Sequence, residues 1–225
     1  MFVVPDGLST AVFLLVVAFV LAAPLAGTWR ATRDPRRVGA LAVGLAAWLT
    51  AMSAFVATGV LERAPIPWLP VFFGLGLLGA TVLALSPVGR GLAEHVPLGV
   101  LIGFQGFRLP LELVLHSWAD QGTIPWSMTW EGSNVDIVTG LLSLLAAPWV
   151  GRSRALAAVV NAVGLLLLVN VGRVAILSSP VPFGWGVEPP LALAAHLPYA
   201  WIGPVCVAGA WAGHLVVFRA LRVTR

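Results

Sequence analysis

Residues 8–28 read LSTAVFLLVVAFVLAAPLAGT, a stretch without a charged side chain. The hydrocarbon core of a bilayer is about 30 Å thick, so an α-helix needs roughly 20 apolar residues to cross it. The stretch therefore predicts a membrane-spanning helix. Further apolar runs follow at approximately 38–60, 68–86, 97–117, 136–150, 156–178 and 199–218. We expect one all-α domain over residues 1–225, a polytopic transmembrane bundle of about seven helices.

The composition excludes several classes of protein. The 225 residues are 59% hydrophobic and 10% charged, whereas soluble domains carry roughly 25% charged residues. The net charge of +4 comes from arginines in short loops, which indicates topology signals and not nucleic-acid binding. The chain has no lysine, which excludes a retinal Schiff base, and one cysteine, Cys206, which excludes an internal disulfide. No two histidines have helical metal-ligand spacing, so we expect no metal and no cofactor.

The arginines predict the orientation of the chain. Ten follow the first, third, fifth and seventh apolar runs: Arg30, Arg33, Arg36, Arg37, Arg90, Arg152, Arg154, Arg219, Arg222 and Arg225. The opposite loops hold only Arg63 and several carboxylates. Because basic residues concentrate in cytoplasmic loops, we expect the N-terminus outside and the C-terminus inside. A cleaved signal peptide is the alternative for the first run, but residues 1–7 lack the positive charge of such a segment.

Polar side chains form a stripe on the fourth apolar run. Residues 103–116 read GFQGFRLPLELVLH, so Arg108, Glu112 and His116 recur every four residues and share one helical face. At 1.5 Å per residue the stripe rises about 12 Å, from mid-membrane toward the outer surface. Pro110 lies within it, removes a backbone hydrogen bond and is expected to kink the helix.

More polar residues are expected on the sixth run and before the fifth. The sixth run contributes Asn161, Asn170 and Arg173, the last roughly level with Glu112. Asn134 and Asp136 directly precede the fifth run, where Asp136 is a candidate helix cap. His196 and His214 are weaker candidates for a functional role. His214 is expected far from this cluster, in a packing role, and His196 is expected in the last outer loop.

Two interpretations of this cluster stay open. In the structural one, Glu112 and Asp136 neutralise Arg108 and Arg173, and the network only fixes helix packing. In the functional one, the cluster lines a cavity open to the outer face. Charged groups near the bilayer centre cost at least ~2.5–3.5 kcal/mol, so they tend to be paired or functional. The candidate ligand-binding residues are Arg108, Glu112, His116, Glu131, Asn134, Asp136, Asn170 and Arg173.

Two stretches carry a resemblance to known families. MTWEGSNVDI (128–137) and AILSSPVPF (175–183) are similar to a family of small bacterial multi-pass membrane proteins, which implies topology but no activity. A fainter resemblance, to exosortases and archaeosortases, lies in the order of three features along the chain. These are the first stretch, then Asn170-Val171-Gly172-Arg173, and then His196. That resemblance implies a transpeptidase with a cysteine, an arginine and a histidine near the outer face. Glu131-Gly132-Ser133 stands where its cysteine is expected, and Cys206 is in another helix.

The leading hypothesis is a multi-pass protein of a bacterial inner membrane that binds or transports a small anionic molecule or a lipid from the outside. One alternative is an exosortase-like hydrolase or transferase, with candidate catalytic residues His116, His196 and Glu112. Another alternative is a structural membrane subunit. The sequence leaves open whether the protein is an enzyme, what the ligand is and whether the chain forms oligomers. Membrane lipids are expected partners.

Overall fold

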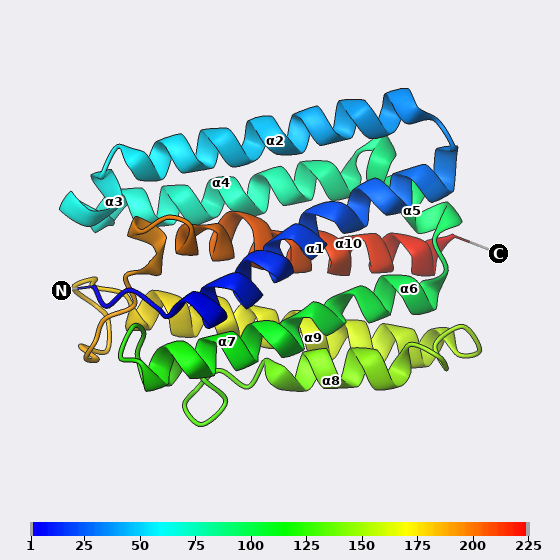
Figure 1. Ribbon diagram of the computed structural model, residues 1–225. Helices are drawn as coiled ribbons and strands as arrows, with labels where there is room; N and C mark the ends of the chain where they lie inside the picture. Colours follow the sequence, from blue (N-terminus) through cyan, green and yellow to red (C-terminus); the bar gives the residue numbers. More distant parts are fainter. Residues whose placement is uncertain (1, 224–225) are drawn as a thin grey trace.

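The computed structural model describes residues 2–223, and these form a helical bundle without any strand (Figure 1). The predicted all-α class is confirmed. Six helical stretches are long and apolar enough to cross a membrane. They are α1 (Gly7–Thr32), α2 (Pro35–Ala57), α4 (Pro65–Leu85), α6 to α7 (Leu98–Asp120), α9 (Arg154–Ser178) and the stretch Tyr199–Arg222, which ends in α10 (Ala208–Arg222).

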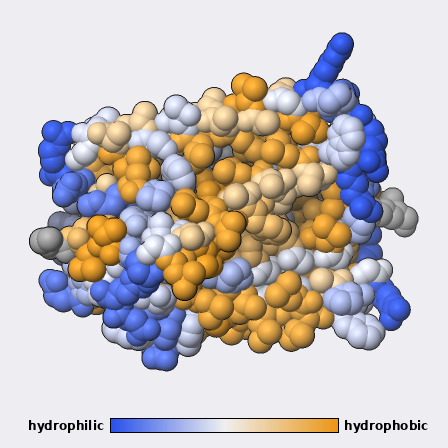
Figure 2. Space-filling view, viewed as in Figure 1, coloured by the Kyte–Doolittle hydropathy of each residue, from blue (hydrophilic) through white to orange (hydrophobic). Residues whose placement is uncertain are grey.

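The chain begins at one end of the bundle and finishes at the other (Figure 1). We call the end where α1 begins the N face and the end where α10 finishes the C face. An apolar band separates two polar ends on the side of the molecule that Figure 2 shows. Such a band over long helices is typical of a multi-pass membrane protein.

The fourth predicted span is not one regular helix. It consists of α6 (Leu98–Gly103), a 3₁₀ turn η1 (Phe104–Phe107) and α7 (Arg108–Asp120). Pro110 lies in the first turn of α7, where its missing N–H is not required. The irregular turn therefore precedes the proline, whose ring would clash with the carbonyl four residues before it in a continuous α-helix.

The fifth predicted span, 136–150, is wrong in extent. The helix α8 covers only Ile137–Ala146 and is followed by turns. Ten residues rise about 15 Å, half of the hydrocarbon core. The non-helical segment 129–136 precedes α8 and forms a loop beside the bundle (Figure 1). Thr129, Asn134 and Asp136 of this segment are buried, whereas Glu131, Gly132 and Val135 are exposed.

Close backbone approaches hold α8 in place. A Cβ on Gly140 would lie 2.6 Å from the backbone nitrogen of Leu109, and a Cβ on Gly99 would lie 2.5 Å from the carbonyl oxygen of Ala147. These glycines let α8 press against the start of α7 and against α6. The N-terminal end of α8 is thereby fixed beside Arg108, at the middle of the bundle.

Two shorter helices complete the connections between the long ones. The helix α3 (Val60–Arg63) links α2 to α4 at the N face, and α5 (Pro87–His95) links α4 to α6 at the C face. The helix α10 packs against both α4 and α9. This central position brings α10 beside the polar side chains of α7 and α9.

Candidate functional site

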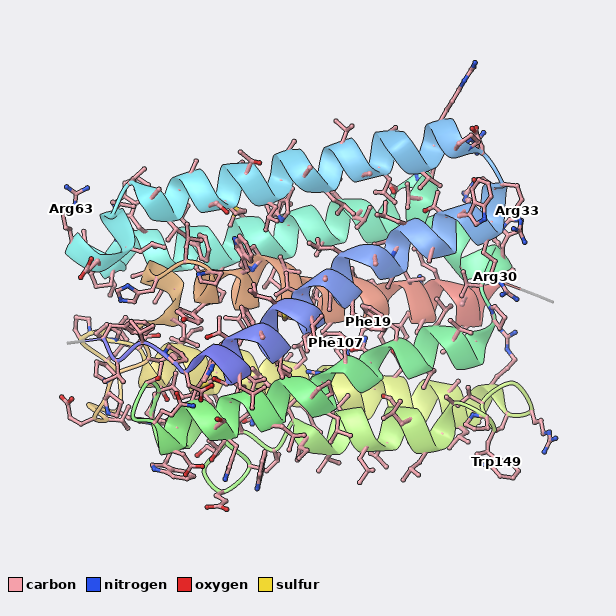
Figure 3. All side chains as sticks on the ribbon, viewed as in Figure 1. Phe19, Arg30, Arg33, Arg63, Phe107 and Trp149 are labelled. Carbon is pink, nitrogen blue, oxygen red and sulfur yellow. The ribbon has the colours of Figure 1, made fainter. Side chains whose placement is uncertain are left out.

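A buried ion pair joins α7 to the segment before α8. Arg108 is the first residue of α7 and its side chain is 2% exposed. Its Nε lies 2.5 Å from Oδ2 of Asp136, and the hydroxyl of Thr139 donates to the other carboxylate oxygen at 2.9 Å. Figure 3 places Phe107, the residue before Arg108, near the middle of the bundle's length. The pair therefore lies near the middle of the bundle.

The opposite side of the guanidinium faces α9 and α10. Its Nη1 donates to the carbonyl oxygen of Gly164 at 3.1 Å and lies 3.3 Å from Nε2 of His214. The other ring nitrogen of His214 is 2.9 Å from Oδ1 of Asn161, whose amide nitrogen donates to the His214 carbonyl at 3.2 Å. Because Nη1 and the amide nitrogen are donors, Nδ1 of His214 carries the proton and Nε2 accepts.

Glu112 lies one turn above Arg108 on α7 and is 2% exposed. Its two carboxylate oxygens are 3.0 and 3.1 Å from the amide nitrogen of Asn134, which also donates to the carbonyl of Met128 at 3.0 Å. The Oδ1 atom of Asn134 accepts from the backbone N–H of Asp136 at 3.2 Å. Asn134 thus links the two acidic residues, but Glu112 makes no ion pair.

The buried charges do not balance when all three groups are ionised. Arg108 and Asp136 neutralise each other, which leaves the carboxylate of Glu112 without a compensating cation within 4 Å among the described residues. An uncompensated charge at this depth costs at least ~2.5–3.5 kcal/mol. With all three groups ionised, the cluster would carry one unbalanced negative charge.

A cavity of about 60 Å³ extends from these residues toward the N face. Arg108, Glu112 and Asp136 form its polar end, and apolar side chains of α7, α9, the stretch before α10 and the segment 191–194 form its walls. Along α9 it reaches from Leu168 to Ser179, roughly 16 Å at 1.5 Å per residue. The Nη2 atom of Arg108 is buried and has no hydrogen-bond partner among the described residues. The cavity therefore has a polar end formed by three ionisable side chains and walls that are mainly apolar.

Arg173 does not join this cluster, and its predicted neutralisation by the buried carboxylates is wrong. Its side chain is exposed, donates to Oδ1 of Asn170 at 2.8 Å and lies 5.7 Å from the ring of Trp185. Asn170 also donates to the carbonyl of Ser133 at 2.8 Å. The face of α9 that carries Arg173 points outward because Val171 and Val174, on either side of it, are buried.

Three other candidates lie outside the cavity. His116 stacks on Trp130 with ring centroids 4.1 Å apart, and no hydrogen-bond partner of its Nδ1 is found in the described chain. His196 stacks on Phe2 at 3.9 Å. Glu131 is exposed. The stripe predicted on the fourth run therefore divides: Arg108 and Glu112 line the cavity, while His116 belongs to an aromatic cluster near the N face.

His214 was predicted far from the cluster, and this prediction is wrong. Its ring contacts Arg108 because Gly164 leaves room for it: a Cβ on Gly164 would lie 2.8 Å from Cε1 of His214. Gln105 is also buried and donates to the carbonyl of Ala210 at 3.0 Å. The sequence did contain a signal, since Gln105 precedes Arg108 by one helical turn and is a polar residue within an apolar run.

Comparisons with protein-family models, with curated proteins and with solved structures find no match. Among residues 2–223 no three histidine, cysteine, aspartate or glutamate side chains are grouped so that they could hold a metal ion. Cys206 is buried and lies on the wall of the cavity, away from both His116 and His196.

Proposed function

We propose that this multi-pass membrane protein binds a small amphiphilic molecule or a lipid in the cavity above Arg108, reached from the outer side of a bacterial inner membrane. The observation that supports this function most directly is an apolar cavity whose polar end includes Arg108, a residue with one buried nitrogen, Nη2, that has no hydrogen-bond partner among the described residues. An unsatisfied buried donor is unfavourable by about 1–3 kcal/mol unless a ligand or water pairs with it.

The distribution of arginines supports an outward N face. Arg30 and Arg33 lie at the C face and Arg63 at the N face (Figure 3). The other C-face arginines on the described part of the chain are Arg36, Arg37, Arg90, Arg152, Arg154, Arg219 and Arg222. Since arginines concentrate on the cytoplasmic side, the C face is cytoplasmic and the cavity extends toward the outside.

The shape of the cavity favours a single-chain ligand with a neutral polar group. Its volume of about 60 Å³ is far below the roughly 300–1,000 Å³ of a usual ligand pocket, so only a slim, unbranched chain would fit between the mainly apolar walls. Nη2 of Arg108 would donate to a hydroxyl or carbonyl oxygen of the ligand. We propose a neutral group, and not the anion that the arginines alone suggest, because Asp136 already neutralises Arg108 and an anion would add an unbalanced negative charge.

Binding is favoured over passage through the membrane. On the C-face side of the cavity, Arg108 is hydrogen-bonded to Gly164 and His214. Gln105 is hydrogen-bonded to Ala210 on the same side. These contacts fill the space between the cavity and the C face. Catalysis has less support, because neither His116 nor His196 is hydrogen-bonded to a serine, threonine or cysteine in the described chain. A purely structural subunit would leave the cavity empty.

Photocrosslinking tests the proposal. The purified protein in nanodiscs is labelled with a long-chain primary alcohol that carries a diazirine, with and without excess unlabelled alcohol. Competable labelling of cavity residues is expected in the wild type. It should fall at least tenfold in Val171→Phe, which fills the cavity, and persist in Val169→Phe, on the lipid-exposed side of the same helix. Equal labelling of both variants would overturn the proposal.

A further inference from the structure

Glu112 differs from the other acidic residues of the chain in its surroundings. The chain has five glutamates, and Glu62, Glu94, Glu131 and Glu188 are exposed, whereas Glu112 is 2% exposed. Its partner is the neutral amide of Asn134, which contacts both carboxylate oxygens. The amide offers two hydrogens to three acceptors, because the carbonyl of Met128 is also within 3.0 Å. Glu112 therefore has few donors for a buried carboxylate.

The groups around Glu112 include one cation, and that cation is already paired. From its own helix it faces Arg108, whose Nε is 2.5 Å from Asp136. From the segment before α8 it faces Asp136 itself, a second negative charge. The cavity-lining residues of α9 and of segment 191–194 are Leu168, Val171, Ala175, Ser179, Leu191, Leu193 and Ala194, none of which is charged. His116, one turn further along α7, stacks on Trp130 instead.

Water has a place beside this carboxyl group. A cavity of about 60 Å³ exceeds the roughly 10–15 Å³ that one water molecule requires. Ordered water occupies such cavities where buried polar groups lack partners. Nη2 of Arg108 is such a group, and it is an observation independent of the acidic residues. Glu112 lines the same cavity as Arg108, so water in the cavity would have a route to the carboxyl group.

We infer that Glu112 is a proton-binding site: its carboxyl group is protonated at rest and exchanges its proton with water in the cavity, from the N face. Release breaks the O–H bond of the carboxyl group, gives the proton to a water molecule as hydronium and changes the cluster from neutral to one negative charge. Binding reverses these steps. Exchange toward the C face is blocked by the hydrogen bonds of Arg108 to Gly164 and His214.

This inference concerns the cavity of the proposed function and extends it, but it does not require the amphiphilic ligand. A ligand that displaced the water would trap the proton on Glu112. Proton binding and ligand binding would then favour each other, because a neutral cluster holds a neutral ligand without an unbalanced charge.

Infrared spectroscopy tests the inference without any ligand. The purified protein in nanodiscs, at neutral pH, is expected to show the C=O stretch of a protonated carboxyl group, shifted in D₂O. Labelling glutamate with ¹³C at its carboxyl group should move the whole band, which assigns it to glutamate and not to Asp136. This labelling needs no substitution, and Glu112 is the only buried glutamate of the described chain. The band should vanish in Glu112→Gln and persist in Glu131→Gln.

Access is measured by the rate of the D₂O shift. Val171→Phe should slow it at least tenfold relative to Val169→Phe, because only the former fills the cavity. A wild type without the band, or a band unmoved by labelled glutamate, would overturn the inference. A band that appears only when choline replaces sodium would also overturn the inference. It would mean that an alkali cation, and not a proton, neutralises Glu112. If crosslinking fails while the band is found, the amphiphile is wrong and the proton site stands.

Discussion

Arg108 and Asp136 form a buried ion pair in which Nε lies 2.5 Å from Oδ2. Asp136 is the last residue before α8. The ion pair therefore fixes the end of the non-helical segment 129–136 at the middle of the bundle. Asn134, two residues earlier, then reaches Glu112. One ion pair thus positions the half-length helix α8, the segment before it and the polar end of the cavity.

Removing either member of this pair should be strongly destabilising. Arg108→Gln or Asp136→Asn leaves one uncompensated charge, and each is expected to lower the free energy of unfolding by about 3–5 kcal/mol. The double variant should lose less than the sum of the two single losses, because it buries no lone charge from this pair. Unfolding in detergent measures all three. Additive losses would contradict the pairing.

Arg173 and Glu112 should behave independently. The two side chains share no partner, since Arg173 is held by Asn170 and Glu112 by Asn134. The double variant Arg173→Ala, Glu112→Gln should therefore show the sum of the single effects on unfolding, within about 0.5 kcal/mol. A larger coupling energy would mean that Arg173 reaches the buried cluster after all.

Gly164→Ala should disturb the polar network from its far side. The new Cβ would lie 2.8 Å from Cε1 of His214 and 2.8 Å from Cγ2 of Thr139. Overpacking of this kind costs about 1–3 kcal/mol. Gly172→Ala is the matched control on the same helix, because nothing lies within 4 Å of its Cβ. The free energies of unfolding of both variants are compared. Equal stability would show that His214 moves aside without loss.

Acidification should weaken the loop that holds His196. Burial lowers the pKa of His196 below its ordinary value of 6.5, and Glu62 opposes this shift only partly. The unfolded chain therefore takes up this proton at a higher pH than the folded chain. The contribution of His196 to stability is present above about pH 6.5 and is lost as the pH falls below it.

His196→Phe provides the control for this pH dependence, because it retains an aromatic ring against Phe2 and cannot be protonated. The melting temperature is measured between pH 5 and 8, a range set by the titration of histidine. The wild type is expected to lose more stability than His196→Phe toward the acidic end. Parallel curves would show that His196 does not titrate with folding.

Orientation is tested with single cysteines. Cys206 is buried, so Cys206→Ala gives a background without reactive thiols. In that background Arg63→Cys, at the N face, should react with an impermeant maleimide added to intact spheroplasts. Arg152→Cys, at the C face, should react only after permeabilisation, because an inward C face shields it. The reverse pattern would invert the proposed topology.

The sequence by itself determined the helical class of the protein and which polar residues share a helical face. Apolar runs such as residues 8–28 must be helical in lipid, because no water is present there to pair with free backbone groups. The spacing of Arg108 and Glu112 placed them on one helical face. These features depend on neighbours along the chain, so local periodicity was sufficient to predict them.

The tertiary structure decided which of these polar groups meet. Arg108 pairs with Asp136, Glu112 with Asn134, and His214 reaches the cluster because Gly164 makes room for it. Arg173, three residues after Asn170, faces outward instead. Such contacts depend on the rotation and depth of helices far apart in sequence, and close packing of small residues sets both. The short length of α8 could not be predicted from the sequence for the same reason. Non-helical backbone beside a short helix is tolerated where neighbouring elements bury it, and the hydropathy of the segment does not show this burial.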